Sequence, residues 1–369
     1  MSKASSNDTL AHAVVVPNSD IFVDAVAADP SAPSAPSLQQ FQNEGGAREF
    51  LSAHGFPQGL QDSFIDALSK LPLRFFIVDD SGSMATSDGK KVTVSGGKKA
   101  MLKCSRWVEL TEALKFHVNF ARQASAPTEF RLLNGAPPIR IGMTDGEEMT
   151  RLSTLNAMLD GSPSGGTPLC RHIREVVATI RAAEQELRAN GQKACLIIAT
   201  DGESSDGNVA EAMAPLKDLP VWVVVRLCTD EERIVNYWNS IDEQLELSMD
   251  VLDDLSGEAQ EVHEKNPWLI YGEPLQRLRE FGISIKEVDL LDEKPLSPDE
   301  VRRIACVIYG GKLDDYPHPE LDFPAFASFI NAKNASTGQT WDPMKKIDRP
   351  WIDTNKLSSA LGKKGCTIS

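Results

Sequence analysis

The sequence is poor in cysteine, in aromatic residues and in positive charge. Its 369 residues include six cysteines, and aromatic residues make up 7% of the chain. Cysteines this sparse, with no CxxC pair, argue against a disulfide framework and indicate reduced thiols. Lysine and arginine number 38 against 53 aspartates and glutamates, a formal net charge of −15. Because a nucleic-acid binder needs a basic surface for phosphates, we expect no nucleic-acid partner.

The chain also lacks a long apolar run. No segment approaches the length of a membrane-spanning helix, and the first twenty residues lack the charged start and apolar core of a secretory signal. Together with the sparse cysteines, this predicts a cytoplasmic protein. Residues 1–45 are rich in Ala, Pro, Ser and Asp and cannot bury much apolar surface, so we expect a disordered tail there.

Apolar periodicity predicts an α/β fold. Residues 46–70 are expected to form a helical lead-in, broken around Gly55 and Pro57. From residue 71 strand-like and helix-like runs alternate, with strands expected at 73–79, 129–134, 138–142, 194–200 and 220–227 and amphipathic helices at 106–122 and 168–188. Continuous apolar strands are buried on both faces. The pattern therefore predicts a doubly wound, mostly parallel sheet with helices on both faces.

The pattern continues less clearly after residue 228. We expect a helix at 231–245, a strand near 247–252, helices near 254–264 and 273–281, a further strand at 283–290 and a helix at 298–309. The main domain would thus span residues 71–255. Residues 256–335 would form a mixed helical extension packed on it, and residues 336–369 a basic tail.

Polar side chains follow two of the expected strands at the points where they end. The spacing D-x-S-x-S places Asp79, Ser81 and Ser83 on one tight loop after the first strand. Thr167 follows two glycines just before a helix, and Asp201 directly follows strand 194–200. Ligands of open α/β sheets bind beyond the carboxyl ends of the strands, so these segments are expected to meet there. Taken singly, each is also an ordinary helix cap.

Together the three segments resemble a known metal site. D-x-S-G-S after the first strand, the Thr of GGTP and the strand-terminal TDG are similar to the metal-ion-dependent adhesion site of von Willebrand factor A domains, which integrin inserted domains share. The resemblance covers residues 71–255, about half of the chain. It implies hydroxyl ligands from Ser81, Ser83 and Thr167, with Asp79 and Asp201 binding directly or through water.

The donor set suits a hard cation. Mg²⁺ takes six oxygen ligands and keeps several waters, and Mn²⁺ or Ca²⁺ could take its place. Two carboxylates and three neutral hydroxyls leave such an ion electropositive enough to accept a carboxylate from a protein partner. The resemblance therefore implies an intracellular, magnesium-dependent protein-binding or adaptor module rather than an enzyme.

The alternative is a metal-dependent phosphohydrolase that uses Asp79 on a similar sheet. Haloacid-dehalogenase-like phosphatases resemble this arrangement, with D-x-D-x-T after the first strand. Ser81 stands where their second aspartate works as acid and base, so the proton-transfer group is missing. The sequence also has no HExxH pair and no ordered Ser-His-Asp set.

The last four residues, beginning at Cys366, resemble the C-a-a-X box of prenylated proteins. From residue 345 onward six lysines and arginines stand against two aspartates. A prenyl chain together with basic residues would tether the chain to the cytosolic face of a membrane. We therefore expect lipidation of Cys366, with an accidental tail cysteine as the alternative.

Overall fold

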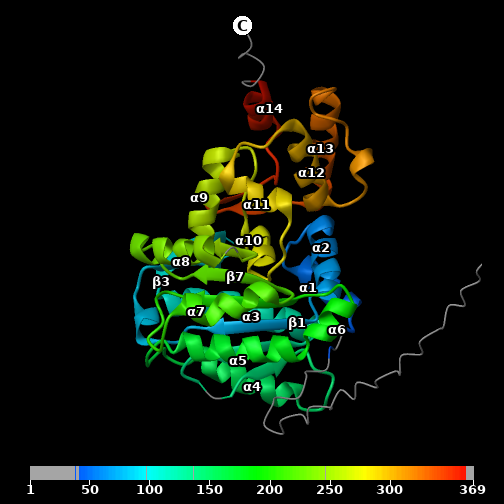
Figure 1. The fold of residues 1–369 in the computed structure, drawn as a ribbon. Coiled ribbons are helices and arrows are strands. Elements are labelled where there is room, and N and C mark those ends of the chain that lie inside the picture. The colour runs from blue at the N-terminus through cyan, green and yellow to red at the C-terminus, as the bar shows by residue number, and fades with distance from the viewer. Residues whose placement is uncertain (1–37, 39–40, 97, 136, 246, 363–369) are drawn as a thin grey trace, which may run out of the picture. The chain divides into compact units, whose positions relative to one another are not determined.

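A six-stranded sheet lies at the centre of the computed structural model, which describes residues 38, 41–96, 98–135, 137–245 and 247–362. The strand order is β5-β4-β1-β6-β7-β8, and β5 alone runs antiparallel to its neighbour (Figure 1). The strands are β1 (Leu73–Val78), β4 (Thr128–Leu132), β5 (Ile139–Ile141), β6 (Ala194–Thr200), β7 (Val221–Leu227) and β8 (Met249–Leu252). The predicted α/β fold with a mostly parallel sheet is confirmed.

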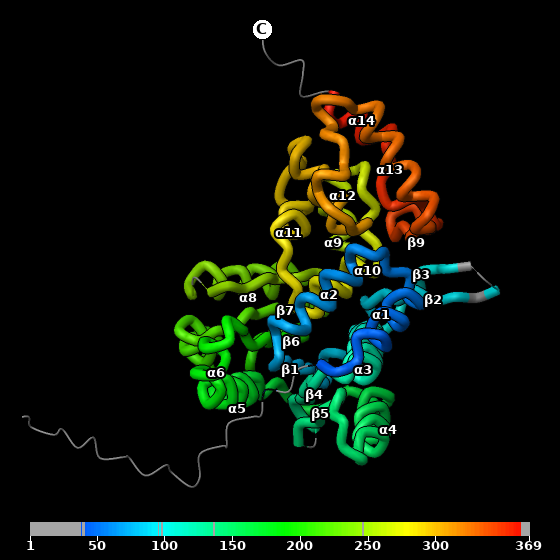
Figure 2. Tube along the Cα trace, turned by 90° about the vertical axis from the view of Figure 1, so that its right-hand side faces the viewer, coloured from blue at the N-terminus to red at the C-terminus, as the bar shows by residue number. Residues whose placement is uncertain are grey.

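Two antiparallel hairpins stand outside this sheet. The first is formed by β2 (Gly89–Ser95) and β3 (Lys98–Cys104), and the second by β9 (Thr340–Asp342) and β10 (Ile347–Arg349). The β2–β3 hairpin projects away from the sheet as a two-stranded ribbon (Figure 2). It lies in the segment between β1 and α3.

Helices account for most of the remaining described chain. They are α1 (Glu44–Ala53), α2 (Gln58–Lys70), α3 (Arg106–Ala124), α4 (Glu148–Leu159), α5 (Leu169–Ala182), α6 (Glu184–Ala189), α7 (Val209–Met213), α8 (Glu232–Leu245), α9 (Leu255–Lys265), α10 (Glu273–Glu280), α11 (Lys286–Glu293), α12 (Pro298–Tyr309), α13 (Phe323–Thr337) and α14 (Thr354–Gly362). Short 3-10 turns lie at Gly82–Ala85, Ala214–Asp218 and Leu313–Asp315. Within the described chain, no helix combines the length and apolar character needed to cross a bilayer.

Two sequence expectations differ from this structure. The strand expected at 283–290 is wrong, because α11 begins at Lys286. Val288 and Leu291 lie three residues apart and are both buried, which is helical spacing that the short apolar run concealed. The single helix expected at 168–188 is two helices, α5 and α6, which meet at Ala183.

Alternate residues of β1 face different helices. Leu73, Phe75 and Ile77 pack in a core with α5, whereas Phe76 and Val78 pack in another core with α3. All six residues of the strand are buried. A strand covered on both faces exposes only its ends, so polar groups gather where β1 ends.

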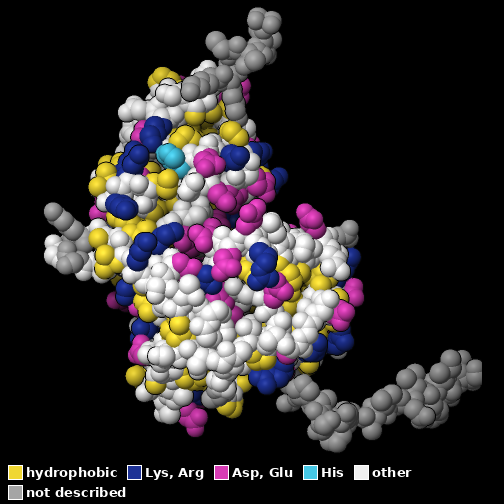
Figure 3. Space-filling model, turned by 90° about the vertical axis from the view of Figure 1, so that its left-hand side faces the viewer, with side chains coloured by type: hydrophobic (Ala, Val, Ile, Leu, Met, Phe, Trp, Pro, Cys, Tyr) yellow, Lys and Arg dark blue, Asp and Glu magenta, His cyan; other side chains and the backbone are white. Residues whose placement is uncertain are grey.

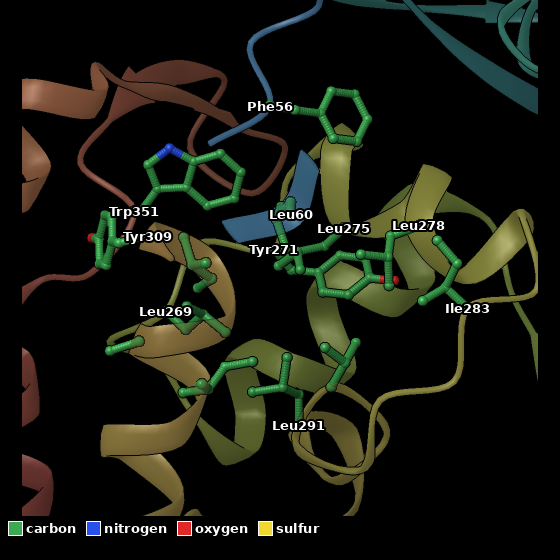
Figure 4. Packing of buried hydrophobic residues seen from close by; sticks show 14 of the residues in the cluster. Phe56, Leu60, Leu269, Tyr271, Leu275, Leu278, Ile283, Leu291, Tyr309 and Trp351 are labelled. Carbon is green, nitrogen blue, oxygen red and sulfur yellow. The ribbon is translucent and has the colours of Figure 1, made fainter. Parts of the chain in front are cut away.

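A third core joins helices that precede the sheet to helices that follow it. It contains buried residues of α1, α2 and α3 together with residues from α9 to α14 (Figure 4). The segments expected as helical lead-in (46–70) and helical extension (256–335) therefore share one apolar interior. Part of the expected basic tail forms the β9–β10 hairpin and α14. Residues 1–37 and Cys366 lie outside the described residues.

Phe281, at the end of α10, lies at the centre of this third core. Its ring centroid is 5.1 Å from those of Phe64 in α2 and Phe120 in α3. The guanidinium carbon of Arg74 in β1 lies 3.7 Å above the Phe281 ring. Arg74 is fully buried, and burial lowers its pKa to about 10. The ring of Phe281 thus packs the two helices and stabilises a buried cation through its π face.

Replacing Phe281 by alanine is expected to lower the free energy of unfolding by about 3–5 kcal/mol, because it leaves a cavity and removes the π face from Arg74. Urea denaturation followed by circular dichroism measures the change. Leu321→Ala is the control, since Leu321 is 85% exposed, and it should change the free energy by less than about 0.5 kcal/mol. Equal, small effects of both substitutions would contradict the central position of Phe281.

Candidate functional site

The candidate site begins where β1 and β6 end side by side. Their parallel register places Val78 opposite Ala199, so Asp79 directly follows β1 beside Thr200, the last residue of β6. The Thr200 hydroxyl donates a hydrogen bond of 2.6 Å to Asp79 Oδ2, and the Ser81 amide donates one of 2.9 Å to Oδ1. Burial raises the pKa of Asp79, while these two hydrogen bonds oppose the shift.

Two serines connect this loop to the end of β6. The hydroxyls of Ser81 and Ser83 lie 3.0 Å apart, and Ser83 donates a hydrogen bond of 2.8 Å to Asp201 Oδ1. Asp201 follows β6 and is 4% exposed. The structure therefore brings together four of the five residues expected from the sequence, joined by hydrogen bonds.

The fifth residue, Thr167, lies on a loop that touches the first one. The Gly82 amide donates a hydrogen bond of 3.2 Å to the carbonyl of Gly165, two residues before Thr167. The Thr167 carbonyl accepts from the Ser205 amide, which follows β6, and the Thr167 amide donates to the Ser205 hydroxyl. Within the described chain, the hydroxyl of Thr167 makes no hydrogen bond. It remains available to a ligand.

Gly165 is required for this approach. Its φ is +97°, and a Cβ atom there would come within 2.6 Å of the side-chain Cγ of Asn134. Asp80 completes the joint between the loops, since its Oδ1 accepts hydrogen bonds from the Asn134 backbone and side chain, both at 2.9 Å. Its carbonyl accepts from Ser164 at 2.7 Å. Asp80 thus links the loop after β1 to Asn134 through its carboxylate and to Ser164 through its carbonyl.

Arg106 is a site residue that sequence reasoning missed. Its guanidinium donates to Asp201 Oδ2 at 3.0 Å and forms further ion pairs with Asp88 and Glu231, at 2.6 and 3.0 Å. The arginine side chain is 5% exposed. These hydrogen bonds raise the pKa of Arg106, the one to Asp88 most, and hold the pKa of Asp88 below its usual range. Arg106 fixes one oxygen of Asp201 and leaves the other on Ser83.

A signal for Arg106 exists in the sequence. Ser105 caps α3 by accepting from the Val108 amide, so Arg106 is the first residue of the helix. A cation at a helix N-terminus is locally unfavourable because the helix dipole is positive there. Such a residue indicates carboxylate partners from elsewhere in the chain, but it does not identify them.

The environment of Asp79 does not suit a phosphohydrolase nucleophile. Its side chain is buried, with 1% of the residue exposed, and both carboxylate oxygens accept hydrogen bonds. A nucleophile needs an unhindered oxygen facing substrate, with an acid or base in reach. Ser81 stands where haloacid-dehalogenase-like phosphatases have their second aspartate, and a serine hydroxyl cannot replace that aspartate as the general acid and base.

A second acidic group lies between α9 and α11. Carboxylate oxygens of Glu258, Glu261 and Asp292 lie within 4.8 Å of one another and could hold a cation. Arg279 already forms ion pairs with Glu258, Asp292 and Asp250. Burial, the first cause, and the neighbouring carboxylates raise the pKa of Glu258 to about 8, despite Arg279. The arginine supplies the positive charge that this cluster needs.

The five predicted residues offer two carboxylates and three hydroxyls from three separate segments. Oxygen donors of this kind suit Mg²⁺ and similar hard cations rather than the soft metals that thiolates select. Among the described residues, the five cysteines are free, and Cys170 in α5 is buried. In comparisons with known proteins, no family model matches the chain, and no curated protein matches it.

Arg106→Met should destabilise the protein in chelator by about 3–5 kcal/mol, because it leaves Asp201 buried without its cation. Arg233→Met is the matched control: Arg233 is 70% exposed and pairs with Glu203 at the surface, so its loss should cost less than about 1 kcal/mol. Urea unfolding of both variants in EDTA measures the difference. An Arg106 variant as stable as the control would show that Asp201 does not depend on it.

The raised pKa of Glu258 predicts a pH-dependent stability. Between its ordinary pKa near 4.5 and about 8, the folded protein holds a proton that the unfolded chain has released. Stability from this group is therefore present below pH 4.5 and is lost as the pH rises to about 8, by at most about 1.4 kcal/mol per pH unit. Glu258→Gln should flatten the decline in urea unfolding between pH 5 and 8.

Glu264→Gln, an exposed substitution on the same helix, is the control for that measurement. It should leave the slope of stability against pH as in the unsubstituted protein. Parallel slopes for all three proteins would show that Glu258 is ionised throughout this range.

Proposed function

We propose that the chain contains a von Willebrand factor A-like domain whose sheet is doubly wound and carries a metal-ion-dependent adhesion site. Ser81, Ser83 and Thr167 would supply hydroxyl oxygens, and Asp79 and Asp201 carboxylates, to Mg²⁺ or to Mn²⁺ or Ca²⁺ in its place. The ion would bind a carboxylate of a protein partner. The protein would act as an adaptor inside the cell, not as an enzyme.

One observation carries this proposal. A continuous series of hydrogen bonds of 2.8–3.0 Å links four of the residues: the Ser81 amide donates to Asp79, the Ser81 and Ser83 hydroxyls are joined, and Ser83 donates to Asp201. The residues come from two strand ends separated by more than one hundred positions, and the Thr167 loop is bound to the same turn. Simple helix caps would not require these hydroxyls and carboxylates to converge.

Charge supports a partner with a carboxylate. Asp79 and Asp201 contribute two negative charges, and Arg106 offsets that of Asp201 through its 3.0 Å ion pair. A divalent ion on these ligands would keep a positive surplus, which an anionic group from outside could complete. The ion supplies an electrophilic binding point, while Arg106 and Thr200 hold the two carboxylates in fixed orientations.

Magnesium binding tests the site directly. Isothermal titration calorimetry of the full chain should show Mg²⁺ binding that Asp79→Ala and Ser83→Ala each abolish, because each substitution removes an oxygen from the set. Asp145→Asn, at an exposed carboxylate paired with Arg151, is the control and should bind as the unsubstituted protein does. Undiminished binding by the Asp79 and Ser83 variants would place the metal elsewhere, with the Glu258 cluster the next site to test.

Partner capture and a phosphatase assay separate the two functions. The immobilised chain should retain a partner in Mg²⁺ and release it in EDTA, and the Asp79→Ala variant should retain none. Hydrolysis of p-nitrophenyl phosphate that depends on both Mg²⁺ and Asp79 would favour the phosphohydrolase instead.

A further inference from the structure

The two hairpins outside the sheet carry an unusual surface for so acidic a chain. Residues 89–104 and 340–349 together contain eight basic residues and two acidic ones, against a net charge of −15 for the whole sequence. Six large hydrophobic side chains are strongly exposed in the described chain. Four of them lie on these hairpins: Val94, Leu102, Met344 and Ile347. Aliphatic and basic side chains therefore occur together on a small part of the chain.

An ion pair brings the hairpins next to each other. The Lys99 ammonium in β3 lies 3.8 Å from a carboxylate oxygen of Asp348 in β10. Lys99 is paired with Val94 across the ribbon, and Asp348 directly follows Ile347. Figure 2 places β9 beside the ribbon. We name Val94, Lys99, Met344, Lys345, Lys346 and Ile347 the hairpin patch.

The base of the ribbon is bound to neighbouring elements. Lys90 pairs with Asp254 at 3.3 Å, and its amide donates to Glu109 at 2.8 Å. Ser256 donates to the sulfur of Met101 at 3.3 Å. The second hairpin is held by Arg349, which pairs with Asp342 and Asp353. Ion pairs and hydrogen bonds thus attach both hairpins of the patch to their neighbouring elements.

Two lysines of the patch, Lys345 and Lys346, keep their charge available, whereas Lys99 pairs with Asp348. Lys345 and Lys346 are exposed and, within the described chain, lie near no carboxylate at ion-pair distance. Lys103 in β3 is also exposed and, among the described residues, has no carboxylate at ion-pair distance. In Figure 3 dark-blue and yellow side chains gather along the margin where the ribbon lies, while magenta carboxylates concentrate nearer the middle of that face. Basic side chains therefore outnumber acidic ones on the two hairpins although the chain as a whole is acidic.

We propose that the hairpin patch is a docking surface for an anionic lipid bilayer. Exposed aliphatic side chains on two neighbouring hairpins suit insertion among lipid headgroups, and lysines around them suit anionic phosphates. A peptide that added a strand to the free edge of the ribbon would be bound through backbone hydrogen bonds rather than through these side chains. Val94 and Lys99 form a pair near the outer end of the ribbon, where both can reach a surface outside the protein.

Vesicle co-sedimentation tests this surface. The experiment uses the full chain with the substitution Cys366→Ser, so that no lipid attached to that thiol can contribute to binding. This protein should bind vesicles of 30% phosphatidylserine and 70% phosphatidylcholine, but not pure phosphatidylcholine. Reversing two lysines, Lys345→Glu with Lys346→Glu, should weaken binding by about 30-fold or more. Raising the salt from 0.1 to 0.5 M should release the protein.

Matched controls separate the patch from general charge and hydrophobicity. Lys193→Glu with Lys286→Glu changes the net charge equally at exposed sites on other elements and should bind as the parent does. Val94→Ser with Ile347→Ser should weaken binding, whereas Met149→Ser with Leu321→Ser should not. Circular dichroism and melting temperatures check that every variant is folded.

Three results would overturn the proposal: no binding to anionic vesicles, equal losses in patch and control variants, or binding to soluble poly-glutamate but not to vesicles. The last would assign the patch to an acidic protein. Concentration-dependent self-association in analytical ultracentrifugation, lost in Val94→Ser with Ile347→Ser, would assign it to a second copy of the chain. None of these outcomes depends on a metal at Asp79, so the magnesium site can fail or succeed independently.

Discussion

The parallel pairing of β1 with β6 is the constraint on which the candidate site depends. It places Asp79 and Thr200 side by side, and a hydrogen bond of 2.6 Å joins their side chains. Ser83 then meets Asp201, one residue beyond the end of β6. Both strands are buried along their whole length, so a shift of register would mispack the cores on both faces of the sheet and is strongly disfavoured. Core packing thus determines how closely the polar groups meet.

Charge is distributed so that each buried carboxylate of the site has a defined partner. Asp79 is held by neutral donors, Thr200 and Ser81, whereas Asp201 is held by the cation of Arg106. The difference suits two carboxylates that share one small site, because Arg106 offsets the charge of one of them. Arg106 is in turn paired with Asp88 and Glu231, which lie nearer the solvent. The ionic series therefore leads from the buried site towards the surface.

The sequence predicts the sheet and the converging loops well, because both depend on local patterns. Continuous apolar runs identify β1, β6 and β7, and polar residues directly after them identify the site. Arg106 escapes prediction because its partners are distant in the chain. The strand expected at 283–290 fails for a related reason: a short apolar run has no period of its own, and tertiary packing decides its conformation. Apolar periodicity likewise does not predict the projecting β2–β3 ribbon, because much of the ribbon is exposed.

The core shared by the first and last helices also bears on how the chain reaches its native state. Leu51 and Phe64 pack in the same interior as Trp351 and Leu357, with the whole sheet encoded between them. During synthesis, α1 and α2 leave the ribosome nearly three hundred residues before their last packing partners. Their apolar faces remain incomplete, covered only by α3, until α10 and the helices after it are made. A chain interrupted before α14 would present that unfinished interior to chaperones and proteases.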